Sequence, residues 1–182
     1  MAEQRKQILD AAGVERCLKR VASEILDSCD PEVPLALVGI RSGGLPLAHR
    51  LASLIGESGG TVPSVGAVDI TLYRDDLYTG LEKPSLGETV LPFGMDGYGI
   101  VLVDDVLFTG RTVRAAMGEL HDYGRPRWIR LAVLVDRGHR ELPVQADFVG
   151  RKVESLPVDR VVVAVGSDAA AEDGAFIVLG QS

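Results

Sequence analysis

The chain alternates between short apolar runs and segments whose apolar positions recur at helical spacing. The first helical segment has apolar residues at intervals of three and four: Val14, Leu18, Val21 and Ile25. This spacing predicts an amphipathic helix that ends near Ser28, with the Asp10 carboxylate as its N-cap. Residues 7–9, just before it, predict a short first strand.

Continuous apolar runs follow, and each has the length of a buried strand. They occupy residues 35–40, 65–72, 100–103 and 128–135. Helical patterns lie between them at residues 45–55 and 112–123, and two late runs at 161–165 and 176–179 predict a hairpin. This alternation predicts one α/β domain over residues 1–182, with a mainly parallel sheet flanked by helices. In such a sheet, ligands bind at the carboxyl ends of the strands.

Composition narrows the class of protein. No apolar run approaches the roughly 20 residues that a membrane span needs, and the polar start MAEQRKQILD has no signal-peptide core. We therefore expect a cytoplasmic protein. Two cysteines, Cys17 and Cys29, form neither a zinc pattern nor a disulfide framework. The net charge of −7 argues against a surface that is basic throughout.

The strongest chemical signal is the stretch from Ile100 to Thr112. An apolar strand delivers two adjacent carboxylates, a glycine-containing loop follows, and a helix begins. The residues with candidate chemistry are Asp104, Asp105, Thr109, Gly110, Arg111 and Thr112. A helix N-terminus offers free N–H groups and a positive dipole end to a phosphate, and the carboxylates suit ribose hydroxyls or a hydrated divalent metal. The stretch is not a Walker loop.

Two other interpretations of this stretch stay open. The loop at residues 109–112 could cap the helix and do nothing more, with Asp104 and Asp105 as incidental charges at a strand end. Adjacent carboxylates after an apolar strand are also typical of phosphoacceptor signalling domains, in which one of the two aspartates is labelled by a small phosphodonor.

The stretch resembles the phosphoribosyl-pyrophosphate motif of type I phosphoribosyltransferases. Further blocks are similar to the bifunctional pyrimidine regulatory proteins of that fold family: residues 38–52, DITLYRDDL at 69–77, LAVLVDRGHRELP at 131–143 and ADFVG at 146–150. The resemblance implies the type I phosphoribosyltransferase fold, which has a small hood and a flexible active-site loop. It also implies transfer of phosphoribosyl from phosphoribosyl pyrophosphate to uracil, giving UMP and pyrophosphate in a pyrimidine salvage reaction.

The resemblance assigns roles to particular residues. Asp104 and Asp105 would hold the ribose hydroxyls and assist Mg²⁺, and residues 109–112 would surround the 5′-phosphate. The turn that would bind pyrophosphate consists of Arg41, Ser42, Gly43 and Gly44. The commoner pattern there is Thr-Arg-Gly, so this chain has Gly43 where an arginine is usual, and Arg41 is a candidate to compensate.

The resemblance also implies which residues lie at the base and which form the active-site loop. Arg137 would lie at the base, and residues 73–91, including Tyr73 and Arg74, would close over the substrate. The 6-oxopurine enzymes have an aspartate three residues after the paired acids, and this chain has Phe108. A phenyl ring cannot exchange a proton with the purine, which disfavours hypoxanthine and guanine.

A regulatory role is implied as well. The similar proteins bind the leader RNA of pyrimidine genes, usually with UMP, through a basic surface on a homodimer or a larger assembly of dimers, and so control transcription attenuation. The matching cations are Lys19, Arg20, Arg140 and Arg151, whereas Ser23 and Gln145 replace a usual histidine and arginine. A non-catalytic UMP-sensing RNA-binding regulator and a phosphoribosyltransferase for another base, such as orotate or a purine, remain alternatives.

Overall fold

The computed structural model describes residues 4–41, 43–70, 88–166 and 172–180. Its larger sheet is parallel and has five strands in the order β3-β2-β4-β5-β6. These strands are β2 (Leu35–Ile40), β3 (Ser64–Val68), β4 (Gly99–Leu107), β5 (Trp128–Asp136) and β6 (Phe148–Lys152). The parallel α/β architecture predicted from the sequence is confirmed.

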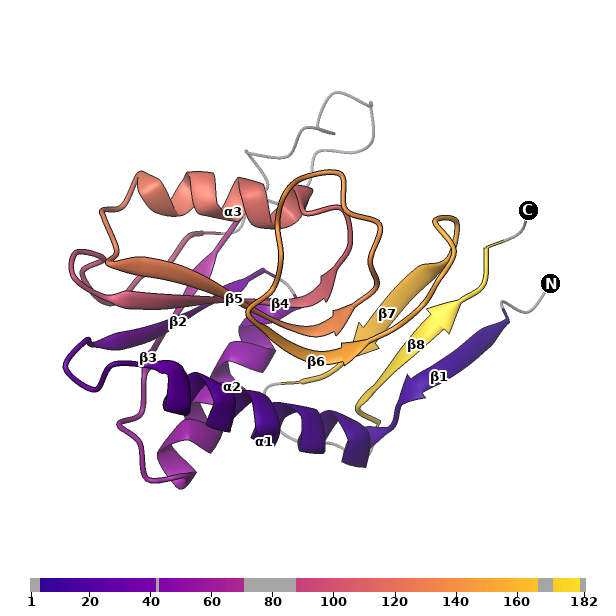
Figure 1. Ribbon diagram of the computed structural model, residues 1–182, viewed down its shortest axis with the longest axis horizontal. Coiled ribbons are helices and arrows are strands. Elements are labelled where there is room, and N and C mark those ends of the chain that lie inside the picture. The colour runs from indigo at the N-terminus through magenta and orange to yellow at the C-terminus, as the bar shows by residue number, and fades with distance from the viewer. Residues whose placement is uncertain (1–3, 42, 71–87, 167–171, 181–182) are drawn as a thin grey trace.

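Helices cover both faces of this sheet (Figure 1). The helices are α1 (Ala11–Ser28), α2 (Gly44–Glu57) and α3 (Arg111–His121). One apolar core lies between the sheet and α1 with α2, and a second lies between the sheet and α3. The predicted N-cap is also confirmed, because the Asp10 carboxylate accepts a hydrogen bond of 2.7 Å from the Gly13 N–H.

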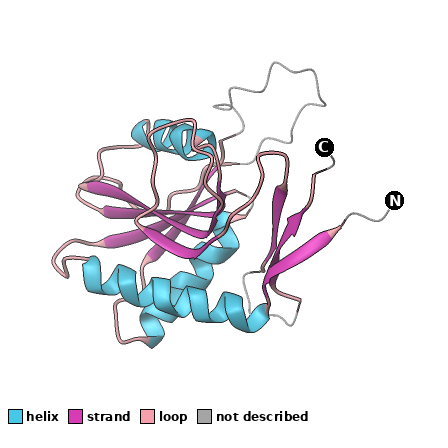
Figure 2. Ribbon diagram, turned by 45° about the vertical axis from the view of Figure 1, so that its right-hand side comes forward, coloured by secondary structure: helices cyan, strands magenta, loops and turns pink. Residues whose placement is uncertain are grey.

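A second, antiparallel sheet stands beside the first (Figure 2). Its order is β1-β8-β7, formed by β1 (Arg5–Leu9), β7 (Arg160–Ala164) and β8 (Gly174–Val178). The predicted hairpin is therefore present, and the N-terminal strand joins it. Buried Arg50 on α2 connects this sheet to the core, because it pairs with Asp173 at 2.6 Å, just before β8, and with Glu15 of α1 at 2.7 Å.

Two predicted strands have other bounds in the structure, and one strand was not predicted. The strand β4 continues through both aspartates to Leu107, because β5 pairs with it along that whole length. The strand predicted over 65–72 ends at Val68, although residues 71–72 lie outside the described part. The edge strand β6 was not predicted, and it pairs with β5.

Candidate active site at the ends of β2 and β4

The strand order has a switch point between β2 and β4. The chain leaves β2 through α2 toward β3 on one side, and it leaves β4 through α3 toward β5 on the other. Such a switch point is where open α/β sheets bind ligands. The structure brings together here the two loops that the sequence singled out, the turn after β2 and the stretch from Asp104 to Thr112.

The turn after β2 packs directly against β4. A Cβ atom on Gly44 would lie 2.0 Å from the Val103 carbonyl oxygen, and one on Gly43 would lie 2.4 Å from the Asp105 carboxylate. Because Gly43 has no side chain, the Asp105 carboxylate can lie directly beside it. An arginine at position 43 would require Asp105 to move. Arg41 is exposed, and its N–H donates to the Val68 carbonyl at 3.0 Å. Ser42 lies outside the described residues.

The paired aspartates have different environments. Asp104 is buried, with 6% of its surface exposed, whereas Asp105 is half-buried. Because both lie within β4, the alternation of a strand directs their side chains to opposite faces. The Asp104 carboxylate accepts a hydrogen bond of 3.0 Å from the Asp105 N–H. Burial raises the pKa of Asp104 well above its ordinary value, and the neighbouring Asp105 charge adds to this increase.

The raised pKa of Asp104 has a consequence for stability. The folded chain keeps a proton on Asp104 at a pH where the unfolded chain has released it, so the free energy of unfolding decreases as pH rises toward the folded-state pKa. Asp104→Asn should therefore raise the free energy of unfolding at pH 8 by about 1–3 kcal/mol, the range for a buried polar group without full compensation, with little difference at pH 4. Urea denaturation in metal-free buffer at both pH values measures this. A variant no more stable than the wild type at pH 8 would contradict the expectation.

The loop between β4 and α3 has the backbone of an anion site. Gly110 is in the left-handed region (φ +91°) and is the residue from which α3 begins. A side chain there would be strained, and the tight turn leaves the first N–H groups of an 11-residue helix without helical partners. Thr109 and the exposed Arg111 and Thr112 surround this helix end.

A second segment, residues 137–144, supports this loop from behind. The Thr109 carbonyl accepts hydrogen bonds from the N–H groups of Glu141 (3.0 Å) and Leu142 (3.2 Å). The Glu141 carboxylate also accepts from two nitrogens of Arg111, Nε and Nη2, both at 2.8 Å. Sequence patterns alone did not reveal this support, although Glu141 and Leu142 belong to the LAVLVDRGHRELP block.

Arg140 belongs to this support. Its Nη1 donates to the carbonyl of Phe108 at 2.8 Å and to that of Gly138 at 3.0 Å, and its Nη2 pairs with Asp136 at 2.6 Å. Within the same segment, His139 has a positive φ of 58°, which is uncommon for a non-glycine residue. Arg140, predicted as an RNA contact, therefore directs its hydrogen bonds into the protein.

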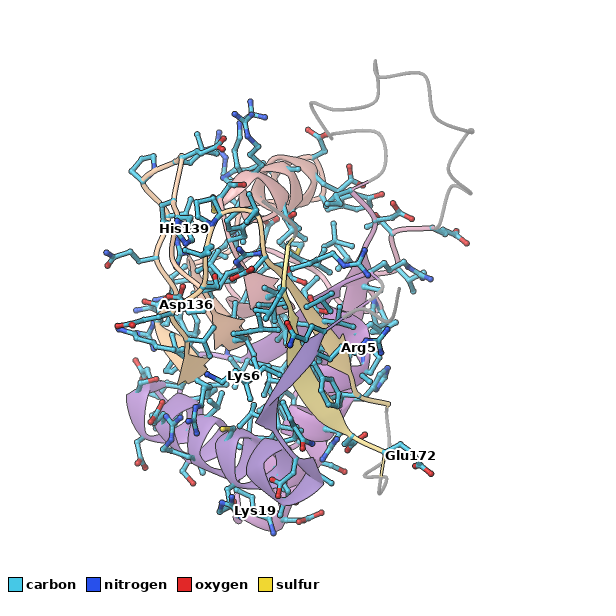
Figure 3. All side chains as sticks on the ribbon, turned by 90° about the vertical axis from the view of Figure 1, so that its right-hand side faces the viewer. Arg5, Lys6, Lys19, Asp136, His139 and Glu172 are labelled. Atoms are coloured by element: carbon cyan, nitrogen blue, oxygen red, sulfur yellow. The ribbon has the colours of Figure 1, made fainter. Side chains whose placement is uncertain are left out.

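Of the other predicted RNA contacts, Arg20 also bonds to the protein, whereas Lys19 and Arg151 are exposed. The Arg20 guanidinium donates to the carbonyls of Val149 (3.0 Å) and Gly150 (2.6 Å) on the edge strand β6. Lys19 has a side chain 61% exposed, 3.4 Å from Glu15, and Arg151 is exposed on β6. Figure 3 shows Lys19 on α1, away from Asp136 at the end of β5 and from His139 on the segment after β5. A cavity of about 320 Å³ beneath that segment includes Arg140, Gln145 and Lys152 in its lining.

Some expectations lie outside the described residues, namely Tyr73 and Arg74 of the predicted active-site loop. Thr89, after that region, accepts from the Asp69 N–H at 3.0 Å and donates to buried Glu119 of α3 at 2.9 Å. Among the described residues, no three His, Cys, Asp or Glu side chains gather as a metal site. No helix in this part of the chain is long and apolar enough to cross a membrane.

The fold and this loop define a protein of the phosphoribosyltransferase class. A family model described as the phosphoribosyl transferase domain matches residues 4–170. A hypoxanthine-guanine phosphoribosyltransferase from Bacillus anthracis superposes with a TM-score of 0.72 over 98% of this chain and 100% of that chain, at 15% sequence identity. A hypoxanthine phosphoribosyltransferase from Staphylococcus aureus gives a TM-score of 0.67 over 90% and 83%, at 19% identity. At these identities the likeness concerns the fold alone.

Sequence relatives are much closer. A protein of Geobacter sp. (strain M21) named bifunctional protein PyrR is 53% identical over 161 residues, 88% of this chain and 91% of the relative. A protein of the same name from Thermus thermophilus is 53% identical over 159 residues, 87% and 88% of the two chains. The chain therefore belongs to the PyrR family of phosphoribosyltransferase-domain proteins.

Proposed function

We propose that the chain is a cytoplasmic uracil phosphoribosyltransferase that also regulates pyrimidine genes through RNA. The observation that carries the enzymatic part is the strand, glycine loop and helix N-terminus of residues 100–112 at the switch point of the sheet, in a chain about half identical to proteins named bifunctional protein PyrR. In the reaction, N1 of uracil forms a bond to the anomeric carbon of phosphoribosyl pyrophosphate. The bond from that carbon to pyrophosphate breaks, and N1 loses its proton.

In the proposed site, different residues bind the 5′-phosphate, the pyrophosphate and the ribose. The 5′-phosphate would accept hydrogen bonds from the backbone N–H groups of residues 110–112 and from Thr109 and Thr112, near the Arg111 charge. Pyrophosphate would lie at the turn of residues 41–44, whose Gly43 and Gly44 approach β4 closely. Half-buried Asp105 would accept from the ribose hydroxyls, and buried Asp104 is the adjacent acid on β4.

The residues at this site fit a magnesium ion that arrives with its substrate. Mg²⁺ commonly keeps several waters and binds through one or two carboxylates plus substrate phosphates. Asp105 and Asp104 supply that number, and the described residues contain no larger group of metal ligands. The bound ion would stabilise the charge that develops on pyrophosphate as it leaves.

The experiment that tests the proposed function asks which base accepts the phosphoribosyl group. Pyrophosphate release should be measured with phosphoribosyl pyrophosphate, Mg²⁺ and one base at a time: uracil, orotate, hypoxanthine, guanine or adenine. We expect release with uracil alone. Release with another base and not with uracil would replace the substrate. No release with any base, together with UMP-dependent RNA binding, would leave the non-catalytic regulator as the function.

RNA binding would use the exposed cations of the α1–β6 side in a homodimer or an assembly of dimers. Lys19 and Arg151 are exposed there, whereas Arg20 and Arg140 bond to carbonyls of the protein. The expected partner is the leader RNA of pyrimidine genes, with UMP as co-ligand, and the outcome is transcription attenuation.

Removing these exposed charges should lower the salt dependence of RNA binding. We expect Lys19→Ala and Arg151→Ala each to reduce the slope of log K against log salt by about 1, the change that follows when one phosphate is no longer neutralised. Lys6→Ala is the matched control, because Lys6 is an exposed lysine on β1 (Figure 3). The measurement is RNA affinity with saturating UMP at several salt concentrations. Equal slopes for all variants would exclude this surface.

A further inference from the structure

Arg137 is a buried arginine whose hydrogen bonds are directed into the protein. Only 5% of its surface is exposed. Its Nε donates to the Ser155 hydroxyl at 3.1 Å, Nη1 to the Asp159 carbonyl at 2.7 Å and Nη2 to the Leu156 carbonyl at 2.7 Å. The guanidinium thus binds the segment of residues 155–159, which leads into β7 of the smaller sheet.

The same guanidinium also contacts the loop at the end of β4. Its central carbon lies 4.0 Å from the centre of the Phe108 ring, which is a cation–π arrangement. His139 approaches the ring edge-on with the two ring centres 6.0 Å apart, and its Nε2 lies 2.7 Å from the Ser155 carbonyl. The Arg137 N–H donates to the Leu107 carbonyl at 3.1 Å.

Phe108 is therefore fixed at several points although its side chain is only half-buried. Its ring is held by Arg137, and its carbonyl accepts from Arg140. In sequence, Phe108 lies between the paired aspartates and the proposed phosphate loop. If these bind ribose and 5′-phosphate as proposed, the ring would lie near the base and limit where a pyrimidine can rest.

We propose that Arg137 is a positioning residue for the base, which acts through Phe108 and the 155–159 segment and does not itself contact the base. This inference rests on the proposed function. It replaces the sequence-based expectation of a direct contact between Arg137 and the base, because the guanidinium edge bonds to residues 155–159 and its face covers Phe108.

The test is a double-mutant cycle in the full chain with Arg137→Lys, Phe108→Leu and the double variant. A lysine retains the charge but loses the planar stack and the three-way hydrogen bonding. The control is Arg130→Lys, because Arg130 stacks on Trp128 at 4.4 Å at the other end of β5. The readouts are kcat, KM for uracil, KM for phosphoribosyl pyrophosphate, and thermal unfolding.

We expect each single variant to raise KM for uracil about tenfold, while KM for phosphoribosyl pyrophosphate changes by less than about threefold. The double variant should be no worse than the more affected single variant, and Arg130→Lys should leave KM for uracil unchanged. Unchanged KM for uracil in Arg137→Lys would overturn the inference, as would multiplied effects in the double variant, which indicate an independent contact with the base.

Three further outcomes separate the inference from the proposed function. If Arg137→Lys does not unfold cooperatively, Phe108→Leu alone decides, and an unchanged KM for uracil in that variant overturns the inference. A wild-type chain that releases no pyrophosphate with any base overturns the proposed function and this inference with it. An active wild-type chain with an unaffected Arg137→Lys variant overturns the inference alone.

Discussion

Replacing both Asp104 and Asp105 with asparagine is expected to reduce UMP formation by about 10³-fold or more while the fold is retained. The two carboxylates lie on β4 at the switch point of the sheet, where they would accept from the ribose hydroxyls and assist the magnesium carried by pyrophosphate. Removing one preorganised electrostatic contact to a transition state typically costs about 10²–10³-fold, and here two are removed. The measurement is pyrophosphate release at saturating uracil and phosphoribosyl pyrophosphate.

The fold should survive because asparagine has nearly the shape of aspartate. Burial already disfavours the charged form of Asp104, so the double variant should unfold at or above the wild-type temperature. A matched control is Asp122→Asn, at the C-terminal end of α3 and away from the loop where α3 begins, which should keep wild-type activity. A double variant that turns over at the wild-type rate would remove the paired acids from the mechanism.

The second large effect is on stability, and it concerns the glycine that begins α2. Gly44→Ala is expected to lower the free energy of unfolding by about 3 kcal/mol or more, at or above the upper end of typical overpacking costs. The added Cβ would lie 2.0 Å from the Val103 carbonyl oxygen and 2.8 Å from its carbon. Both atoms belong to the backbone of a buried strand, so a rotamer change cannot relieve the contact. Chemical denaturation measures the difference.

Gly94→Ala is the control for this substitution, because a Cβ on Gly94 would meet nothing within 4 Å. We expect it to change stability by less than about 0.5 kcal/mol. Any folded Gly44→Ala protein should also lose activity, since α2 must move away from β4 where Asp104 and Asp105 lie. A Gly44→Ala variant as stable as Gly94→Ala would show that the turn and β4 are not packed as described.

The fold could be predicted where the signal is local. The run LALVGI forms β2 with the predicted bounds, because a strand buried on both faces must be apolar throughout. The predicted end of β4 was wrong, because two aspartates resemble a strand terminus, whereas pairing with β5 continues to Leu107. The strand β6 escaped prediction because its short sequence FVGRK carries little signal apart from its partner strand.

The same distinction applies to the site. The phosphate loop is a contiguous strand, glycine and helix start, so the sequence indicated it directly. The contacts of Arg137 and Arg140 could not be predicted, because each arginine donates to carbonyls of another segment: Arg137 to Leu156 and Asp159, and Arg140 to Phe108. The family resemblance implied that both arginines face a ligand, and the structure shows their hydrogen bonds directed into the protein.

A crystal structure of the chain with UMP and Mg²⁺ would show whether residues 100–112 hold the nucleotide. We predict the 5′-phosphate within hydrogen-bond distance of the N–H groups of residues 110–112 at the start of α3, the ribose hydroxyls at Asp105, and the uracil ring against Phe108. A UMP phosphate bound elsewhere, such as in the cavity beside Arg140 and Lys152, with the 110–112 loop empty, would contradict this assignment.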